Sequence, residues 1–466
     1  MSDAHPATPP ITAEICDFIA ATRLTDIPAS VIARGHVHML DALGLAVAGQ
    51  RTAVCAILRR HVDGLGVTAS NAAILGGAMR SAPGFAALIN GAAMHADNFD
   101  DTGPQASPAR NGGIHATAAV LPAALALAEA RGATGAALSA AVHVGLEVAG
   151  KLNHAIGARH YGDGFHVTGT IGVFGAAAAC AHLMGFDAAT TACALALAAS
   201  RSAGLRANFG YMAEQAHTGQ AAENGLLSAL LAGQGMTGAP AILEAPVGWF
   251  QAAGGGVDPN VILGRLGAPW VFDAPGMSIK PWPNGALTHP AMTLLSELIA
   301  AHGIKAADVA GITVRTNARI KATLIHDRPS DAMQARFSMP FCLAALLVAG
   351  HAGLAEFTDE IVARADISAM MARIDYAAFD EPGADFTNVT TLMTLDLADG
   401  TTHEGRCDYA RGSNRAPMSW DDIGGKFTSC LAAVDWPEDK AAAAIEAMAD
   451  LESLDDMAAL VAPLTA

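Results

Sequence analysis

Closely spaced cysteines are absent from this sequence. Seven cysteines are scattered along 466 residues, and no two of them form a C-x-x-C pair. A disulfide framework or a structural zinc site needs such spacing, so both are excluded, and reduced thiols in a cytoplasmic protein are expected. The N-terminal segment MSDAHPATPP has no basic stretch followed by an apolar one, so no secretory signal is predicted.

Positive charge is also scarce. The chain carries 27 Lys and Arg against 44 Asp and Glu, a formal net charge of −17. Nucleic acid and anionic membranes are therefore unsuitable partners, and an anionic substrate would need a local group of cations. The most apolar window, residues 171–186, is short for a membrane span, is mostly Ala and Gly, and contains His182. We expect it to be a buried helix.

The signatures of common cofactor and metal enzymes are missing. There is no H-E-x-x-H, P-loop or G-x-S-x-G motif, and the glycines at 169, 172 and 175 follow no predicted strand, so they indicate helix packing rather than dinucleotide binding. The D-x-x-D-D spacing of residues 97–101 resembles a magnesium motif of terpenoid synthases. That class needs a second metal motif and an aromatic-lined cavity, whereas aromatic residues make up only 5% of this chain. No cofactor and no metal are expected.

Alanine, glycine and leucine dominate instead. Residues 11–236 read as successive helices punctuated by glycine-containing turns, and small residues allow such helices to approach closely. A Gly/Pro-rich stretch at 248–283 interrupts this pattern and indicates a domain boundary.

Beyond the boundary the pattern is mixed. Residues 289–302 and 337–350 are typical of helices, residues 311–316 of a strand, and residues 389–397 of a strand that enters a hairpin at Asp399-Gly400. Helices return after Trp420 and are expected to pack on the first domain. The predicted fold class is therefore mainly α, a large all-helical domain plus a smaller α+β domain. The predicted domains are residues 1–266 with 404–466, and residues 267–403.

His115 and His166 carry the most chemical information. Each precedes an Ala-rich or Gly-rich stretch that is predicted to be a helix. A helix start offers unpaired N–H groups and a positive dipole end, which attract carboxylates and keep a histidine neutral. The two residues could equally be satisfied core histidines. The functional interpretation is a pocket for an acidic small molecule with a base beside it.

Three further segments could carry chemistry. Residues 95–102, HADNFDDT, could bind a metal, orient a histidine or form a solvated turn. In the segment 206–219, Glu214 and His217 would share a helix face, so that the carboxylate could hold the imidazole tautomer or form an exposed ion pair. In Ser278–Pro283, prolines on both sides of Trp282 would direct Lys280 into a cleft.

Together these segments resemble the MmgE/PrpD family, over most of the chain and in the same order. The blocks are NGAAMHADNFDDT, IHATAAVLPAALALAEA, GFHVTGTIGVFGAAAA, ANFGYMAEQAHTGQAAENG, IKPWPNGALTH and ARFSMPFCLAALLVAG. The resemblance implies a helical domain with a smaller α+β lid, an active site between them, and a homodimer without a bound cofactor. It also implies action on a small polycarboxylate, by 2-methylcitrate dehydration, cis-aconitate decarboxylation or iminodisuccinate epimerisation.

The family's site is only partly kept. His115 and His166 match its catalytic histidines. Asn98 stands at a position that is usually Asp, Glu214 where decarboxylases have Lys, and Gly285 where they have His. Residues in matching motifs are Asp100, Asp101, Thr102, His217, Lys280 and His289. Because these losses remove charge that would hold a third carboxylate, a dicarboxylate substrate is expected.

The resulting hypothesis is a cofactor-independent epimerase of iminodisuccinate. The alternatives are a 2-methylcitrate-type dehydratase or a cis-aconitate-type decarboxylase, and a non-catalytic carboxylate-binding relative. The predicted catalytic residues are His115, His166 and Lys280 as bases, with Tyr161 or Tyr211 as donors. The predicted substrate-binding residues, together with backbone N–H groups at the two helix starts, are Asn98, Asp101, Thr102, Arg206, Glu214, His217 and His289.

Overall fold

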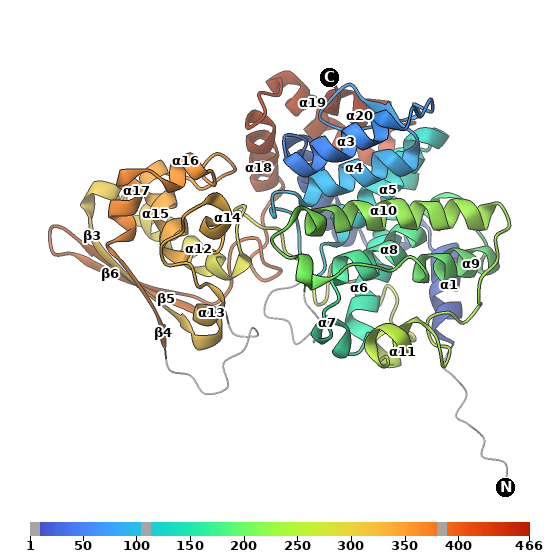
Figure 1. Ribbon diagram of the computed structural model, residues 1–466, viewed down its shortest axis with the longest axis horizontal. Coiled ribbons are helices and arrows are strands. Elements are labelled where there is room, and N and C mark those ends of the chain that lie inside the picture. Colours follow the sequence, from blue (N-terminus) through green and yellow to red (C-terminus); the bar gives the residue numbers. More distant parts are fainter. Residues whose placement is uncertain (1–9, 104–112, 380–388) are drawn as a thin grey trace, which may run out of the picture.

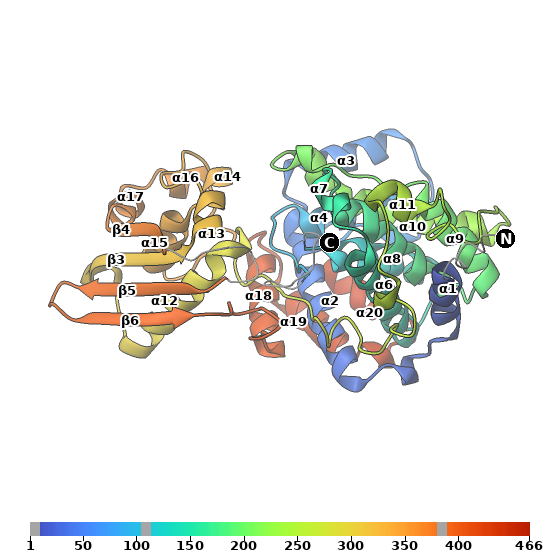
Figure 2. The same cartoon turned by 90° about the horizontal axis from the view of Figure 1, so that it is seen from below.

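A computed structural model describes residues 10–103, 113–379 and 389–466. A helical domain occupies one side and a lid of mixed α and β structure projects from the other, with α18 lying between them (Figures 1 and 2). This arrangement confirms the predicted fold class. The helical domain also contains a short antiparallel hairpin, β1 with β2, that the sequence did not suggest.

The helical domain is built from both ends of the chain. Its elements are α1 (Ile11–Ala21), α2 (Ala29–Gly49), α3 (Ala53–Gly64), β1 (Ala72–Ala73), β2 (Arg80–Ser81), α4 (Pro83–His95), α5 (Ala116–Arg131), α6 (Gly135–Ala155), α7 (Arg159–Gly162), α8 (Val167–Leu183), α9 (Ala188–Ala199), α10 (Met212–Gly233), α11 (Trp249–Gly254), α18 (Trp420–Ala432), α19 (Glu438–Ala449) and α20 (Ala458–Val461). The last three pack back on the domain as predicted, with Phe427 of α18 lying against Gly44 of α2.

Small residues bring these helices together. A Cβ atom added at Gly172 of α8 would lie 2.7 Å from the Ala119 side chain of α5. One added at Gly175 would lie 2.8 Å from the Val120 side chain of the same helix. At Gly169 it would lie 2.4 Å from the carbonyl oxygen of Ala203. The prediction that this glycine run serves helix packing is therefore confirmed, and α8 lies buried among α5, α6 and α10.

Within residues 10–103, 113–379 and 389–466, one helix is long and apolar enough to cross a membrane by length and composition alone. It is α2, with a mean hydropathy of 1.2, and 78% of its apolar window is buried inside the fold. Its apolar residues are therefore used to build the protein core. The window predicted to be a buried helix, residues 171–186, lies mostly in α8 and is a core element too.

The lid has a four-stranded sheet of order β4-β3-β5-β6. Its elements are α12 (His289–His302), β3 (Val309–Asn317), α13 (Ala318–Thr323), α14 (Ala332–Ala335), α15 (Met339–Ala349), α16 (Asp359–Val362), α17 (Ala365–Met371), β4 (Ile374–Phe379), β5 (Thr391–Leu397) and β6 (Thr402–Cys407). β3 is parallel to β4 and antiparallel to β5. Helices α12, α15 and α17 share a second core with one face of the sheet (Figure 1).

The predicted domain boundaries differ from the observed packing at both ends of the lid. Trp270, Phe272 and Ile279 belong to the core of the helical domain, so the lid begins later than residue 267. Strand β6 extends to Cys407, so the predicted boundary between 403 and 404 falls inside a strand. The Gly/Pro-rich stretch begins while the chain is still packed in the helical domain. A change in composition therefore does not mark the residue at which the chain enters the lid.

Candidate active site

A cavity of roughly 320 Å³ opens between the two domains. This volume suits a small molecule. It is bordered by the turn after α4, by the first residues of α5 and α8, by the start of α10, and by the lid segment around α14. The lining residues are His95, Ala96, Asn98, Thr102, Gly113, His115, Tyr161, His166, Phe209, Gly210, Glu214, Gln215, Lys280, Gly285, Ala286, Met333, Arg336 and Phe337.

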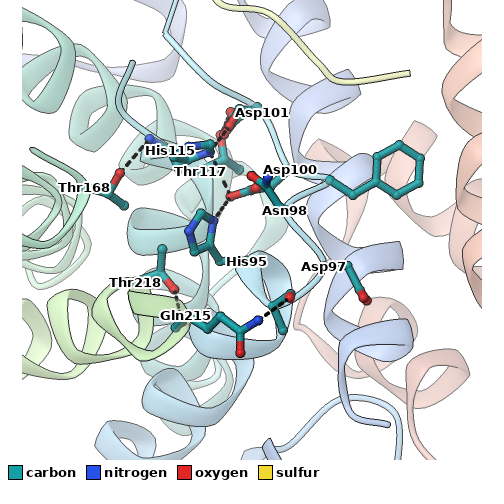
Figure 3. Close-up of polar contacts among 12 residues, drawn as sticks. His95, Asp97, Asn98, Asp100, Asp101, His115, Thr117, Thr168, Gln215 and Thr218 are labelled. Atoms are coloured by element: carbon teal, nitrogen blue, oxygen red, sulfur yellow. Dashed lines mark hydrogen bonds and ion pairs between the residues drawn. The ribbon is translucent and has the colours of Figure 1, made fainter. Parts of the chain in front are cut away.

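His115 stands at the start of α5, as the sequence predicted. Its Nδ1 lies 2.6 Å from the carbonyl oxygen of Asp101 and 3.2 Å from Oδ2 of Asp100. A carbonyl oxygen only accepts hydrogen bonds, so Nδ1 carries a proton. In the neutral ring, Nε2 then keeps a lone pair that can remove a proton from a ligand. Figure 3 shows the His115 ring directed toward Asp101.

His166 stands at the start of α8 and is held from behind by His217 of α10. The two Nδ1 atoms lie 2.9 Å apart, so one ring donates to the other. Burial, reinforced by the positive charge of His95, lowers the pKa of the His166 imidazole to about 2. His166 is therefore a neutral imidazole at physiological pH, and His217 fixes its orientation.

His95 lies beside His115 and His166 and differs from His166 in being positively charged. Its Nδ1 lies 2.8 Å from Oδ2 of Asp100, and its Nε2 lies 2.8 Å from Oε1 of Glu214. Burial opposes a charge on the ring, but the two carboxylates outweigh burial and raise the pKa of His95 to about 10. Burial would likewise raise the pKa of Glu214, yet the His95 charge lowers it to about 2. The three groups form a chain of two carboxylates around one imidazolium.

Within the described residues, one set could hold a metal ion: His95, Asp100 and His115, whose ligand atoms lie within 4.8 Å of one another. Both ring nitrogens of His95 already have carboxylate partners, and His115 donates from Nδ1 to a carbonyl. These contacts occupy both ring nitrogens of His95 and Nδ1 of His115 without an ion, and they account for the cluster's geometry. Oδ1 of Asp100 is buried and has no hydrogen-bond partner among the described residues.

Besides the His95 imidazolium, a lysine and an arginine line the cavity. Lys280 donates from Nζ to the carbonyl oxygen of Asn98, at 2.8 Å, and also to its side-chain oxygen. Burial lowers the pKa of the Lys280 ammonium to about 8. The arginine, Arg336, comes from the lid and contacts Asp97, the residue before Asn98. One turn of the helical domain thus holds both cations.

The turn rests on a buried lysine of the C-terminal part of the chain. Lys426 of α18 donates to the carbonyl oxygen of Phe99 at 2.7 Å and to that of Lys280 at 2.9 Å. Its Nζ also lies 2.6 Å from Oδ1 of Asp41 on α2. Asn98 has a positive φ of 53°, a left-handed conformation that asparagine tolerates better than most residues.

The structure divides the predicted site residues into two groups. Seven line the cavity: Asn98, Thr102, His115, Tyr161, His166, Glu214 and Lys280. Five lie outside its lining: Asp101, Arg206, Tyr211, His217 and His289. Tyr211, a predicted proton donor, is 69% exposed.

The other residues outside the lining have partners of their own. Asp101 accepts from His38 at 2.9 Å and from Thr117. Arg206 donates to the carbonyl oxygen of Tyr161 at 2.8 Å and stacks on its ring. His289 is buried, with Nε2 2.6 Å from the side-chain oxygen of Asn284.

Two expected interactions take a different form. Glu214 orients His95 rather than His217, because α4 packs on α10 and its last residue, His95, lies against the start of α10. Backbone N–H groups at the two helix starts were expected to bind carboxylates. Those of His115 and His166, the residues just before α5 and α8, instead donate to Oγ1 of Thr168 and to the carbonyl oxygen of Gly204.

The residues that sequence reasoning missed are His95 and Arg336. His95 belongs to the HADNFDDT segment, for which the orientation of a histidine is one of the predicted roles. It lies 119 positions before Glu214, and no local pattern links the two. No sequence pattern indicated a role for Arg336, because an isolated arginine in the sequence of the lid cannot be distinguished from an ordinary surface residue.

Comparisons with known proteins agree with this architecture. The MmgE/PrpD N-terminal domain matches residues 13–262, and the MmgE/PrpD C-terminal domain matches residues 282–452. The chain is 27% identical over 462 residues to cis-aconitate decarboxylase of Homo sapiens, covering 97% of this chain and 93% of that protein. It is 26% identical over 461 residues to the Mus musculus protein of the same name, covering 97% and 92%. A cis-aconitate decarboxylase of Aspergillus terreus is 26% identical over 377 residues, covering 75% and 74%.

Proposed function

This chain belongs to the MmgE/PrpD family, and we propose that it is a cofactor-independent lyase acting on a small polycarboxylate. In this proposal His115 moves a proton at a carbon next to a carboxylate. The proposal rests on the hydrogen bonding of His115. Its Nδ1 donates to a backbone carbonyl oxygen, and the residue lines the cavity. The relatives named above are decarboxylases, so they favour a lyase and give no support to the epimerase hypothesis.

The other cavity residues complete the proposed chemistry. Proton removal next to a carboxylate leaves negative charge on that group, which needs fixed cations or donors around it. Lys280 and Arg336 supply two cations, so two carboxylates of a substrate can each meet one. His166, as a second neutral imidazole in the cavity, can hydrogen-bond another part of the substrate, whereas its low pKa of about 2 makes it a much weaker base than an ordinary histidine.

The replacement of the decarboxylase lysine by Glu214 keeps epimerisation as a second candidate. We expected Glu214 to repel an anionic group, but its ion pair with His95 offsets that repulsion. The exchange still removes a cation from the cavity. A reaction that needs only proton removal and return would tolerate this loss better than one that must hold a third carboxylate.

Proton NMR in D₂O separates these reactions. The purified protein would be incubated separately with cis-aconitate, 2-methylcitrate and one stereoisomer of iminodisuccinate. Loss of CO₂ indicates a decarboxylase, loss of water with a new alkene signal a dehydratase, and a deuterated second stereoisomer an epimerase. A lyase product from either of the first two substrates is the expected result, and epimerisation alone would replace the lyase proposal.

Substituting the proposed base tests the site. We expect His115→Ala to lower kcat by at least about 100-fold, because general acid–base groups contribute about 10²–10⁴-fold. The control is His61→Ala, at a histidine on α3 outside the cavity, which should leave kcat unchanged. Full activity in folded His115→Ala protein would contradict the assignment.

A further inference from the structure

The lid's Arg336 is held by the helical domain. Arg336 follows α14, lines the cavity, and has a side chain that is 14% exposed. Its Nη1 donates to the carbonyl oxygen of Asp97 at 2.8 Å, and its Nη2 lies 3.3 Å from Oδ1 of the same residue. This pair joins the two domains at the edge of the cavity.

Asp97 is itself fixed from the opposite side. Arg51, just beyond α2, places Nη1 2.7 Å from Oδ2 of Asp97 and Nη2 2.9 Å from Oδ1. Such a two-pronged contact fixes the plane of a carboxylate as well as its position. Asp97 is 4% exposed, so the carboxylate cannot turn away into solvent. Arg51 and Asp97 together form a rigid support for Arg336.

The support is separate from the proton-transfer residues. Asp97 lies apart from the His95, Asp100 and His115 cluster (Figure 3). A guanidinium has five N–H donors, and the two contacts with Asp97 leave others for a ligand in the cavity. The guanidinium is planar, and holding it in one position keeps these donors directed at the same place in the cavity.

We propose that Asp97 is a positioning residue, which holds Arg336 so that its remaining N–H groups bind one carboxylate of the substrate. The proposal rests on the proposed function in that the ligand is a polycarboxylate. It assigns the two cations different supports within one turn, Asp97 for Arg336 and Asn98 for Lys280. It also means that carboxylate binding draws on both domains.

A purely structural role for Asp97 makes a different prediction. If Asp97 only joins the domains, its removal lowers stability and changes ligand affinity independently of Arg336. If Asp97 acts through Arg336, its removal has no further effect on affinity once Arg336 is gone. A double-mutant cycle distinguishes these two cases.

The cycle is measured by calorimetry on the full chain. Wild-type protein would be titrated with succinate, cis-aconitate and 2-methylcitrate, and the tightest-binding compound used for all variants. We expect Arg336→Gln and Asp97→Ala each to raise Kd about tenfold or more, the loss typical of one charge-assisted contact. The double variant should bind no more weakly than Arg336→Gln alone, and Asp97→Glu should recover part of the affinity. Multiplied losses in the double variant, or an unchanged Kd in Asp97→Ala, would overturn the proposal.

Two controls keep the test decisive. Asp97→Asn retains the carbonyl contact and replaces Asp97→Ala if the latter does not fold; it should raise Kd by a smaller factor. Hydrogen exchange of residues 332–337 needs no ligand and should be faster in either variant than in the wild type. If the wild type binds none of the three compounds, the proposed function fails on its own. Unchanged exchange would then overturn the positioning role independently.

Discussion

Lys280 is a cavity residue whose charge depends on pH close to neutrality. Its Nζ is buried, and its hydrogen-bond partners among the described residues are two neutral oxygen atoms, both of Asn98. Burial therefore brings the pKa of its ammonium down to about 8, while Asp100 and Glu214 limit the decrease. Lys280 is mostly protonated below that pH and mostly neutral above it.

Carboxylate binding should consequently weaken as the pH rises through about 8. The protonated form attracts a carboxylate and the neutral form does not, so Kd should increase by about tenfold per pH unit well above this pKa. Calorimetry between pH 6.5 and 9.5 would measure the profile. Lys280→Arg, whose guanidinium stays protonated throughout, should give a flat profile. A flat wild-type profile would mean that Lys280 does not hold the carboxylate.

Sequence reasoning at the scale of single residues succeeded where the signal was local. His115 and His166 were placed at helix starts because an Ala-rich or Gly-rich helix follows each of them directly. The partners of His95 and Arg336 come from distant segments, and their contacts depend on how the domains pack. Tyr211, predicted as an alternative to Tyr161 as the proton donor, is 69% exposed, and its exposure was not indicated by any local pattern.

At the scale of elements, glycines decide how closely helices approach. Gly219 of α10 faces α4, where an added Cβ would lie 2.0 Å from the carbonyl oxygen of Leu88. Gly425 of α18 has no atom within 4 Å of the same added position. Both glycines are helical, but only Gly219 is in close contact with a neighbouring helix.

This contrast predicts opposite effects of the same substitution. Gly219→Ala should lower the free energy of unfolding by about 1–3 kcal/mol, because the helices must separate to admit the methyl group. Gly425→Ala should raise it by about 0.5–1 kcal/mol, because alanine loses less conformational entropy in a helix. Urea unfolding of the two variants and the wild type measures both effects. A stable Gly219→Ala protein would show that α4 and α10 are not tightly apposed.

Elements with a strong periodic pattern were predicted well. The expected strand at 311–316 is β3, the expected helix at 289–302 is α12, and the Asp399-Gly400 hairpin joins β5 to β6. Strand β4 was missed. It lies parallel to β3 at the edge of the sheet, and its short sequence IDYAAF shows little alternation. Its position follows from pairing with β3, which a local pattern cannot reveal.

At the scale of the whole molecule, Lys426 connects distant parts of the chain. It contacts Asp41 on α2 and the backbone of Phe99 and Lys280, and it is almost completely buried. Removing one member of a buried ion pair leaves the other charge without a partner, which costs about 3–5 kcal/mol. The residue thus contributes to stability and also fixes the backbone of Phe99 and Lys280 beside the cavity.

Lys426→Met should accordingly lower the free energy of unfolding by about 3–5 kcal/mol. The double variant with Asp41→Asn should recover part of this loss, because no charge is then left buried. Lys305→Met, at an exposed position on the lid, should change stability by less than about 0.5 kcal/mol. Denaturant unfolding followed by circular dichroism measures all three. Equal stabilities of Lys426→Met and Lys305→Met would contradict the role given to the buried pair.

The contact between Gly44 of α2 and Phe427 of α18 also has a consequence for biosynthesis. The apolar face of α2 emerges early from the ribosome, whereas α18 emerges only after the entire lid has been made. At a translation rate of about 5–20 residues per second, α18 is synthesised on the order of tens of seconds after α2. α2 also packs on α4, α5 and α6, which are made early, so only the part of it that contacts α18 lacks its partner for most of synthesis. The helical domain completes folding only after translation nears its end, and chaperones that bind such surfaces have time to engage it.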